Sequence, residues 1–462
     1  MTTDATPSVP PTAARVLSPF VPSAGATDDA VIMALVSAEV ALVRAWIRVG
    51  LAPSSVGEQV DQVWGWDATA RRCTRHSLDR AALATSLAQH GNPVIGLVEQ
   101  MRSALGADAA AWVHRGATSQ DILDTALMIV TRDVTREAGT ALTAVEANLT
   151  ALAVANRDVT AVARTLTQHA VPTTAGARVA GWVRGIARAR ARLAHAGEAL
   201  PVQLGGAAGT LASFVEVART QQGATASPED VVRHLVAAFA DELGLTAPAA
   251  PWHTVRADVT EPGDALVQVC DALAKFGADV ATLSRTEIAE VSVSSAGGSS
   301  AMPHKRNPVA AVALRSAGMR APMLGATLHV ASASAVDERP DGAWHAEWPT
   351  LQDLLELALG ACGTAVELSQ SLTINLKEIA ANLELSRGAI LSERLSIALP
   401  PLVGPEVTTA AVRVASEGGD LAGFLTSQAK LPGAVVAEIT DLTNATGLAT
   451  WLVDTLPTAE RP

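Results

Sequence analysis

Apolar side chains recur every three or four residues through the middle of this chain, without a break over long stretches. Between residues 266 and 283 the apolar positions are Leu266, Val269, Leu273, Phe276, Val280 and Leu283. Such a seam predicts a helix that packs lengthwise against other helices. Similar spacing predicts one helix over about 122–156 and another between 176 and 199. Long helices of this kind imply a bundle, and any leftover apolar faces are best buried by self-association.

The regions on either side of the long helices show shorter patterns. From Asp28 the apolar spacing predicts a helix that stops near Gly50, and further helices follow to about Leu105. After Pro349 the helices shorten, and Gly-Pro and Gly-Gly breaks interrupt the chain. We therefore predict an all-α fold of three helical domains: an N-terminal domain over 1–113, a central long-helix bundle over 114–355, and a small C-terminal domain over 356–462.

Charge and cysteine content exclude several classes of protein. The net charge of −12 argues against nucleic acid or an anionic membrane as a partner. The three cysteines are far apart and odd in number, which fits reduced thiols better than disulfides or a zinc cluster. The N-terminal segment carries Asp4 and lacks the apolar core of a signal peptide, and no uncharged apolar run reaches membrane-spanning length. We expect a cytoplasmic protein.

One polar loop, residues 298–308, has a composition that no hydrophobic core needs. It reads GSSAMPHKRNP, with two serines, two cations, a histidine and an amide. The Gly-rich start of such a loop is mobile and can close over a ligand. Lys305 and Asn307 supply hydrogen-bond donors suited to a carboxylate. Beside that charge, Ser299 or Ser300 can lose a proton more easily than in water. A plain surface loop would explain a fragment of this string, but the whole string favours a site for a small polycarboxylate.

A second polar segment, residues 114–121, precedes the long helix predicted from about residue 122. It reads HRGATSQD, and Thr118, Ser119 and Asp121 are good candidates for capping that helix. The same hydroxyls, with free backbone N–H groups at a helix start, can also form an anion site. The residues alone leave both interpretations open.

A third polar segment, residues 164–174, reads RTLTQHAVPTT. Its His169 fits either a structural histidine or a group that transfers protons or binds carboxylates near neutral pH. His345 and Glu347 form another polar pair among tryptophans. With no second histidine four residues on and no cysteine nearby, we expect no metal site there.

The segments 114–121, 164–174 and 298–308 resemble, in order, the three signature regions of the fumarase/aspartase superfamily, and the resemblance spans about residues 15–456. It implies a central bundle that forms a homotetramer, with the three regions meeting from three subunits in shared sites. It also implies elimination, or its reverse, next to a carboxylate. A proton leaves the carbon α to that carboxylate, an aci-carboxylate builds up, and a group on the β carbon departs, without a metal or organic cofactor.

The resemblance also assigns roles to residues of this sequence. The serine that corresponds to Ser299 acts as base in elimination and as proton donor in addition, and His169 is the second candidate catalytic residue. Substrate binding is implied for a larger group of polar residues: His114, Thr118, Ser119, Gln203, Ser300, Lys305 and Asn307. The separate roles of His114 and His169 stay open.

The ending HKRNP matches two branches, the adenylosuccinate lyases and the bacterial 3-carboxy-cis,cis-muconate cycloisomerases. In the hydrating and ammonia-releasing branches, a His in the second region pairs with a Glu after the loop. The matching positions here are Leu166 and Val312. Replacing both by apolar residues avoids a buried unpaired charge, which costs roughly 3–5 kcal/mol. A lactonisation tolerates the loss of this His–Glu pair. The group that leaves in the reverse reaction is a carboxylate, which is stable as an anion and needs no proton.

Other stretches also resemble the cycloisomerase branch: 203–211, 251–254, 342–348 and 442–447. Adenylosuccinate lyases usually hold their nucleotide with an Arg-Tyr near the N-terminus, and this chain has no tyrosine. We therefore expect conversion of 3-carboxy-cis,cis-muconate to 4-carboxymuconolactone, in protocatechuate (β-ketoadipate) breakdown. Fumarate release from adenylosuccinate is the alternative. A non-catalytic member of the superfamily is a third, since folds are reused without chemistry.

Overall fold

The computed structural model describes residues 17–20, 24–220, 227–294, 302 and 305–456. Close contacts divide the chain into two compact units, the first formed by 1–139, 191–270 and 319–360, the second by 140–190, 271–318 and 361–462. Helices α6, α7, α10, α11 and α12 each contribute residues to both units. The three-domain division expected from the sequence stays a prediction, because this grouping follows the long helices and does not test those boundaries.

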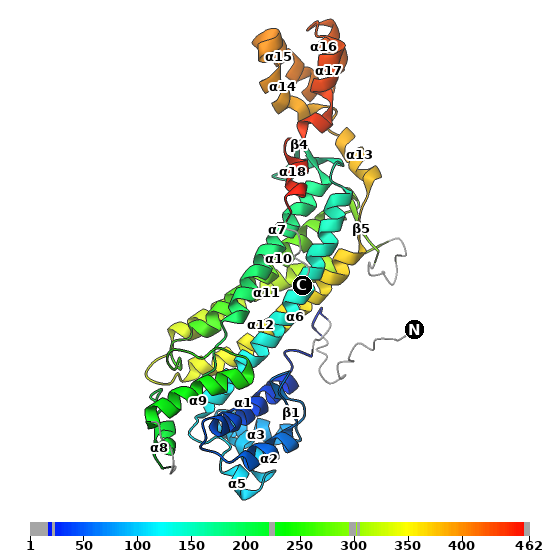
Figure 1. Ribbon diagram of the computed structural model, residues 1–462. Helices are drawn as coiled ribbons and strands as arrows, with labels where there is room; N and C mark the ends of the chain where they lie inside the picture. Colours follow the sequence, from blue (N-terminus) through cyan, green and yellow to red (C-terminus); the bar gives the residue numbers. More distant parts are fainter. Residues whose placement is uncertain (1–16, 21–23, 221–226, 295–301, 303–304, 457–462) are drawn as a thin grey trace. The chain divides into compact units, whose positions relative to one another are not determined.

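Helices make up most of the described chain (Figure 1). The α-helices are α1 Asp28–Arg48, α2 Ser54–Trp64, α3 Arg80–His90, α4 Val94–Ser103, α5 Ala107–Ala110, α6 Ser119–Ala155, α7 Ala175–Glu198, α8 Ala212–Thr220, α9 Pro228–Leu243, α10 Ala257–Leu283, α11 Val309–Ala333, α12 Gly342–Ser371, α13 Leu376–Glu384, α14 Ser392–Ala398, α15 Pro400–Ser416, α16 Leu421–Ser427, α17 Gly433–Thr440 and α18 Ala449–Asp454. Two short 3₁₀ helices are η2 Ala389–Leu391 and η3 Leu442–Ala445.

The strands form three separate antiparallel pairs in the described part of the chain. They are β1 Trp66–Asp67 with β2 Arg72–Cys73, β3 Thr160–Thr165 with β4 Gln168–Thr174, and β5 Val291–Val293 with β6 Leu372–Ile374. None of these pairs extends into a larger sheet. The predicted all-α fold class is confirmed, although the sequence did not predict these strand pairs.

The long helices form where the periodic patterns predicted them. The helix expected over 122–156 is α6, which runs for 37 residues from Ser119 to Ala155. The seam from Leu266 to Leu283 lies on α10, and all six of its apolar side chains are buried. Because a stripe at this spacing occupies one face of a helix, burying it aligns α10 lengthwise with its neighbours within each unit.

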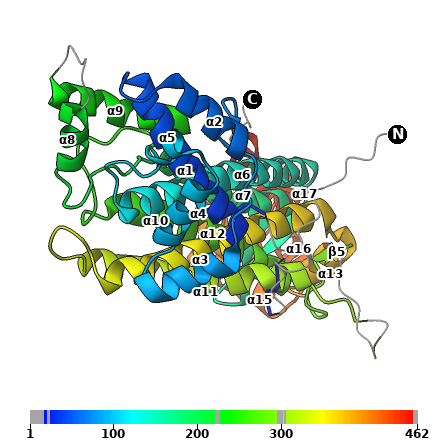
Figure 2. The same ribbon diagram turned by 90° about the horizontal axis from the view of Figure 1, so that it is seen from below.

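In the first unit, α1 is a core helix that begins and ends at sequence signals. Thr27 caps its start by accepting a hydrogen bond from the backbone N–H of Ala30 at 3.3 Å, and Asp28 and Asp29 lie in the first turn. The helix ends just before Gly50, whose φ of +80° suits glycine. Its buried face packs along α9, which lies beside it (Figure 2).

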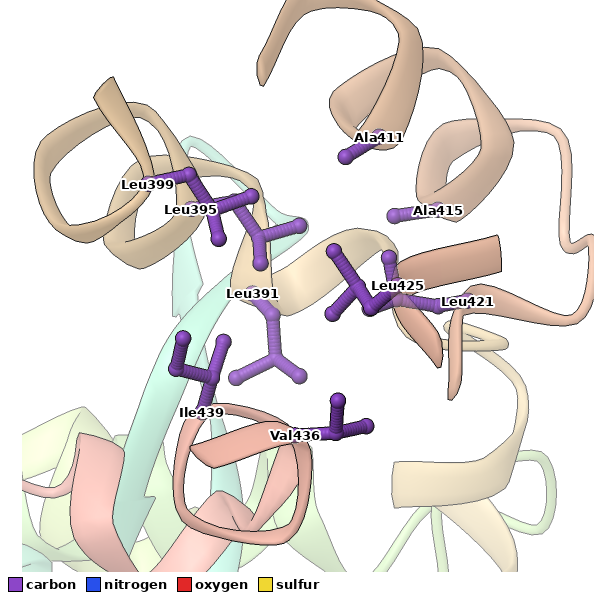
Figure 3. Packing of buried hydrophobic residues seen from close by; sticks show 9 residues of the cluster. All are labelled: Leu391, Leu395, Leu399, Ala411, Ala415, Leu421, Leu425, Val436 and Ile439. Atoms are coloured by element: carbon purple, nitrogen blue, oxygen red, sulfur yellow. The ribbon is translucent and has the colours of Figure 1, made fainter. Parts of the chain in front are cut away.

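The second unit ends in a small cluster of apolar side chains contributed by short helices. Figure 3 shows these side chains converging between α14, α15, α16 and α17: Leu391, Leu395, Leu399, Ala411, Ala415, Leu421, Leu425, Val436 and Ile439. Each of these helices buries only one to three of its residues, so none could stand alone in water. The helices were expected to shorten after Pro349, but α12 runs through Pro349 to Ser371, and the short helices begin with α13 at Leu376.

Two helices, α1 and α6, are long and apolar enough by composition to cross a membrane. The apolar window of α1 is 72% buried within the protein, and its Glu39 is fully buried with a polar partner. Core helices of folded proteins meet the same criterion as membrane spans. The expected absence of a membrane partner and the cytoplasmic location stay predictions.

Candidate active site

In the first unit, His114 is held in an unusual backbone conformation by a buried carboxylate of α1. Its φ of +60° lies in the left-handed region, which a histidine adopts at some cost in conformational energy. Glu39 accepts the backbone N–H of His114 at 2.9 Å through Oε2, and its Oε1 lies 2.6 Å from Nδ1 of the ring. The side chain of Glu39 has no exposed surface. Both oxygens of one carboxylate therefore fix the backbone and the ring of His114 together.

The pKa of His114 is raised above its ordinary value by this contact. Burial alone would lower the pKa, but the charge of Glu39 and its hydrogen bond outweigh burial. Because the pKa is higher in the folded chain than in the unfolded chain, the pair adds its full stability below the unfolded pKa. That contribution disappears as the pH rises through the folded pKa.

Asp121 connects three segments that lie far apart in the sequence. Its carboxylate accepts the backbone N–H of Thr118 at 3.0 Å, as in a helix-capping box. It also accepts the backbone N–H groups of Gly205 and Gly206, at 2.8 and 2.9 Å, and lies 2.9 Å from Nε2 of His253. The capping role expected for Asp121 is confirmed. The partly exposed Thr118 and Ser119 lie at the start of α6, where substrate binding stays a prediction.

Gln203, a predicted substrate-binding residue, is fully buried in this loop region. Its Oε1 accepts the backbone N–H of Trp252 at 3.1 Å, while its buried Nε2 has no hydrogen-bond partner among the described residues. A buried amide with an unused donor is costly unless something else bonds to it. The oxygen of Gln203 thus has a structural role, and only its nitrogen could still bind a ligand.

A surface hollow of about 420 Å³ lies beside the start of α6 in the first unit. Five of its lining residues belong to α4, namely Val94, Ile95, Val98, Glu99 and Arg102. The other two are His114 and Ser119. The guanidinium of Arg102 donates to the carbonyl of Val113 at 2.9 Å, which holds it close to His114. No local sequence signal marks Arg102, because it lies at the end of an otherwise ordinary helix.

In the second unit, His169 lies on β4 in the β3–β4 hairpin. Its Nδ1 is 2.8 Å from the hydroxyl oxygen of Ser386. Burial lowers the pKa of His169, and the nearby charge of Arg164 lowers it further. A histidine in this state is neutral at neutral pH and can accept or donate a proton through its other ring nitrogen.

Glu290 anchors this hairpin to the residues that lead into the 298–308 loop. Its fully buried carboxylate binds Arg164 of β3 at 2.6 Å and Arg178 of α7 at 2.8 Å, and it accepts from the amide of Asn382 at 3.0 Å. Burial would raise the pKa of Glu290, but the two arginines hold it below its usual value. Since β5 begins at the next residue, this cluster fixes the start of the segment that leads to the loop.

Leu166 and Val312, which were expected at buried positions, are both exposed in the single chain. Leu166 lies at the turn of the β3–β4 hairpin and is 96% exposed, and Val312 on α11 is 54% exposed. In a single chain, charged side chains at these positions would reach solvent, so the expected penalty for a buried unpaired charge stays a prediction about the assembled protein.

The predicted residues divide between the two units. His114, Thr118, Ser119 and Gln203 belong to the first unit, while His169, Lys305 and Asn307 belong to the second. Lys305 is exposed and Asn307 partly exposed, just before α11 begins. Ser299 and Ser300 lie outside the described residues, so their roles stay predictions.

His345 and Glu347 on α12 point to separate partners. The ring of His345 hydrogen-bonds to the carbonyls of Asp341 and Gly91, whereas Glu347 binds Arg256 at 2.7 Å. Arg256 also binds Asp124 at 2.7 Å, and all three side chains are buried. Among the residues that the structure describes, no three His, Cys, Asp or Glu side chains gather as a metal site would need.

Comparison with known proteins agrees with this architecture. The sequence matches the Lyase family over residues 25–322. A nitrosuccinate lyase of Streptomyces davaonensis is 42% identical over 446 residues, covering 93% of this chain and 91% of the relative. A 3-carboxy-cis,cis-muconate cycloisomerase of Pseudomonas aeruginosa is 37% identical, covering 82% and 79% of the two chains.

Solved structures give the same result for the fold. The 3-carboxy-cis,cis-muconate lactonizing enzyme of Pseudomonas putida superposes with a TM-score of 0.81 at 32% identity, over 94% of this chain and 96% of that one. A fumarate lyase from Mesorhizobium superposes with a TM-score of 0.79 at 29% identity, over 94% and 96%. With the fold, the three polar segments and these matches in agreement, the chain belongs to the lyase family of the fumarase/aspartase superfamily.

Proposed function

We propose that this chain is a lyase that releases nitrite from nitrosuccinate by β-elimination. The observation that carries this proposal is the 42% identity to a nitrosuccinate lyase over 93% of the chain. The cycloisomerases are 34–37% identical over 82–85% of it. A small dicarboxylate also suits the hydrogen-bond donors that the sequence places in the 298–308 loop.

The reaction is balanced without a redox partner. A base takes a proton from the methylene carbon α to one carboxylate, and the electron pair of that C–H bond forms the double bond. The C–N bond on the neighbouring carbon breaks with its electrons, so that nitrosuccinate gives fumarate, nitrite and a proton. Ser299 is our proposed base, with Lys305 and Asn307 stabilising the aci-carboxylate that develops. We expect turnover without an added cofactor.

The leaving group accounts for the missing His–Glu pair. Nitrite departs as a stable anion, so it needs no protein group to protonate it, unlike hydroxide. Leu166 and Val312 therefore cost nothing in this chemistry. What a departing anion and a dicarboxylate do need is positive charge, and the hollow beside α6 offers Arg102 and His114.

The cycloisomerase reaction is the second candidate, and it is favoured by the close superposition on the Pseudomonas putida lactonizing enzyme. It makes the same demands on the protein. A substrate carboxylate adds to the conjugated double bond of 3-carboxy-cis,cis-muconate while the α carbon gains a proton, and the leaving group in reverse is again a stable anion. Both candidates therefore share the proposed roles of Ser299 and the carboxylate-binding groups.

The test is an assay of the purified full chain with racemic nitrosuccinate and no added metal or cofactor. We expect nitrite and fumarate to appear in equal amounts, each measured independently. Spontaneous elimination would release the same two products, so heat-inactivated protein measures the background rate that is subtracted. Absence of both products, with bleaching of 3-carboxy-cis,cis-muconate, would replace this proposal by the second candidate.

We also propose that copies of this chain assemble along α11 into a homotetramer with shared active sites. In the second unit, Val309 and Val312 are 55% and 54% exposed. In the first unit, Met319, Met323 and Val330 are 66–69% exposed. These positions follow one another by three, four or seven residues on one helix, which is the spacing of a helix-packing seam. An apolar stripe of this kind is best covered by another copy.

Met323→Glu is expected to break this assembly, because a charge within a helix seam loses its hydration when the seam is buried. The mass in solution, measured by light scattering, should fall from that of a tetramer to smaller species, with activity lost in parallel. Ile397→Glu is a matched control, since Ile397 is 73% exposed and belongs to a different helix, α14. A tetramer that survives Met323→Glu unchanged would contradict the assignment of this surface.

A further inference from the structure

The pairing of Glu39 with His114 goes beyond the roles that resemblance assigns to the signature segments. Glu39 belongs to α1, outside all three segments, yet both of its oxygens are engaged by His114. We propose that Glu39 is a positioning residue that keeps His114 cationic, so that His114 and Arg102 together bind one carboxylate of the substrate in the hollow beside α6. This inference rests on the proposed function, because it names the group that holds its dicarboxylate substrate.

The geometry leaves one ring nitrogen for a ligand. Nδ1 of His114 is occupied by Glu39 at 2.6 Å, on the buried side. The imidazole still has 18% of its surface exposed and lines the hollow, while Glu39 has none exposed. Among the described residues, no group hydrogen-bonds to Nε2 of His114. Nδ1 carries a proton that it donates to the carboxylate of Glu39. When Nε2 carries a second proton, the ring is a cation that can donate a hydrogen bond into the hollow.

The charges around the ring favour this state. Glu39 on α1 and Asp121 on α6 raise the pKa of His114, whereas burial and Arg102 on α4 lower it, and the net direction is upward. Glu99, also on α4, lies exposed at the edge of the hollow. Among the residues that line the hollow, protonated His114 and Arg102 carry two positive charges and Glu99 carries one negative charge, while Glu39 and Asp121 do not line it. One positive charge thus remains for a substrate carboxylate, in a geometry that suits charge-assisted hydrogen bonds.

The pH dependence separates this role from that of a general base. A cationic His114 binds an anion best at low pH, and binding weakens as the pH rises through its pKa. A general base must be neutral, so its contribution would instead grow with rising pH. Fumarate, the proposed product, serves as a probe of binding that requires no turnover.

The experiment measures fumarate binding to the full chain by calorimetry across pH, in buffers of different ionisation enthalpy that reveal proton uptake. Wild-type protein should bind with little proton uptake at neutral pH. In Glu39→Gln the pKa of His114 falls, so binding at neutral pH should be about ten-fold or more weaker, with close to one proton taken up. The same variant should approach wild-type affinity at low pH.

Two further variants keep the test decisive. Glu146→Gln removes another buried carboxylate, which binds Arg190 at 2.6 Å in the second unit, and it should leave the pH profile unchanged. His114→Asn tolerates the left-handed backbone and should bind weakly at every pH, with no alkaline loss. Wild-type affinity in Glu39→Gln at all pH values, or no fumarate binding by wild type, would overturn the inference. Normal pH-dependent binding without nitrite release would overturn only the proposed function.

Discussion

Replacing Ser299 by alanine is expected to lower kcat for nitrosuccinate by roughly 10²- to 10⁴-fold, the range that a positioned proton-transfer group usually contributes. The substitution removes the proposed base but leaves the cations that bind the carboxylates. Fumarate affinity, measured by calorimetry, should therefore stay close to wild type. The loss should thus appear in kcat and hardly in substrate affinity.

Mixing variants tests whether the site is shared between subunits. Ser299→Ala and His169→Asn should each be nearly inactive alone. When the two are dissociated and reassembled together, some sites receive both intact segments from different subunits, so activity should return to a substantial fraction of wild type. No recovery, with mixed tetramers shown to form, would contradict shared sites. Undiminished activity in Ser299→Ala alone would refute the assignment of the base.

Arg256→Met is expected to lower the free energy of unfolding by about 3–5 kcal/mol. Arg256 has no exposed side-chain surface, and it is the partner of Asp124 and Glu347, which are 0% and 2% exposed. Removing the guanidinium leaves two carboxylates buried side by side. It also removes the stacking of Arg256 on Trp252, 4.7 Å from the ring centroid. Denaturant titration would measure the effect.

Arg233→Met serves as the matched control for this prediction. Arg233 forms an ion pair with Asp230 three residues earlier on α9, but its side chain is 72% exposed. Ion pairs in solvent contribute little because water screens them, so the same substitution should hardly change the unfolding transition. Equal destabilisation by both substitutions would mean that the buried cluster does not depend on its charge pairing.

Sequence periodicity predicted the helices because burial of one face decides their position. The seam of α10 and the start of α1 at Asp28 follow directly from apolar spacing and capping residues. The β3–β4 hairpin was not predicted for an equally physical reason. Its turn residues, Leu166 and Thr167, both adopt positive φ, at 48° and 72°, although neither is the Gly or Asn that usually marks such a turn.

The candidate site was predicted only where residues are close in sequence. Asp121 was recognised as a cap of α6, but its contacts with Gly205 and His253 join segments 84 and 132 residues away. Glu39 lies within an apolar helix and Arg102 at the end of an ordinary one, so nothing local distinguishes them. Their roles depend on the packing of α1 and α4 around His114, which no short motif encodes.

The central claim is that this lyase acts on a nitro-substituted succinate, and the most direct measurement compares two substrates on one preparation of the protein. We expect kcat/KM for nitrosuccinate to exceed that for 3-carboxy-cis,cis-muconate by at least about ten-fold, which corresponds to 1.4 kcal/mol of transition-state discrimination. Both rates should be lost together in Ser299→Ala. A larger kcat/KM for the muconate, with nitrite release no faster than in heat-inactivated protein, would contradict the claim.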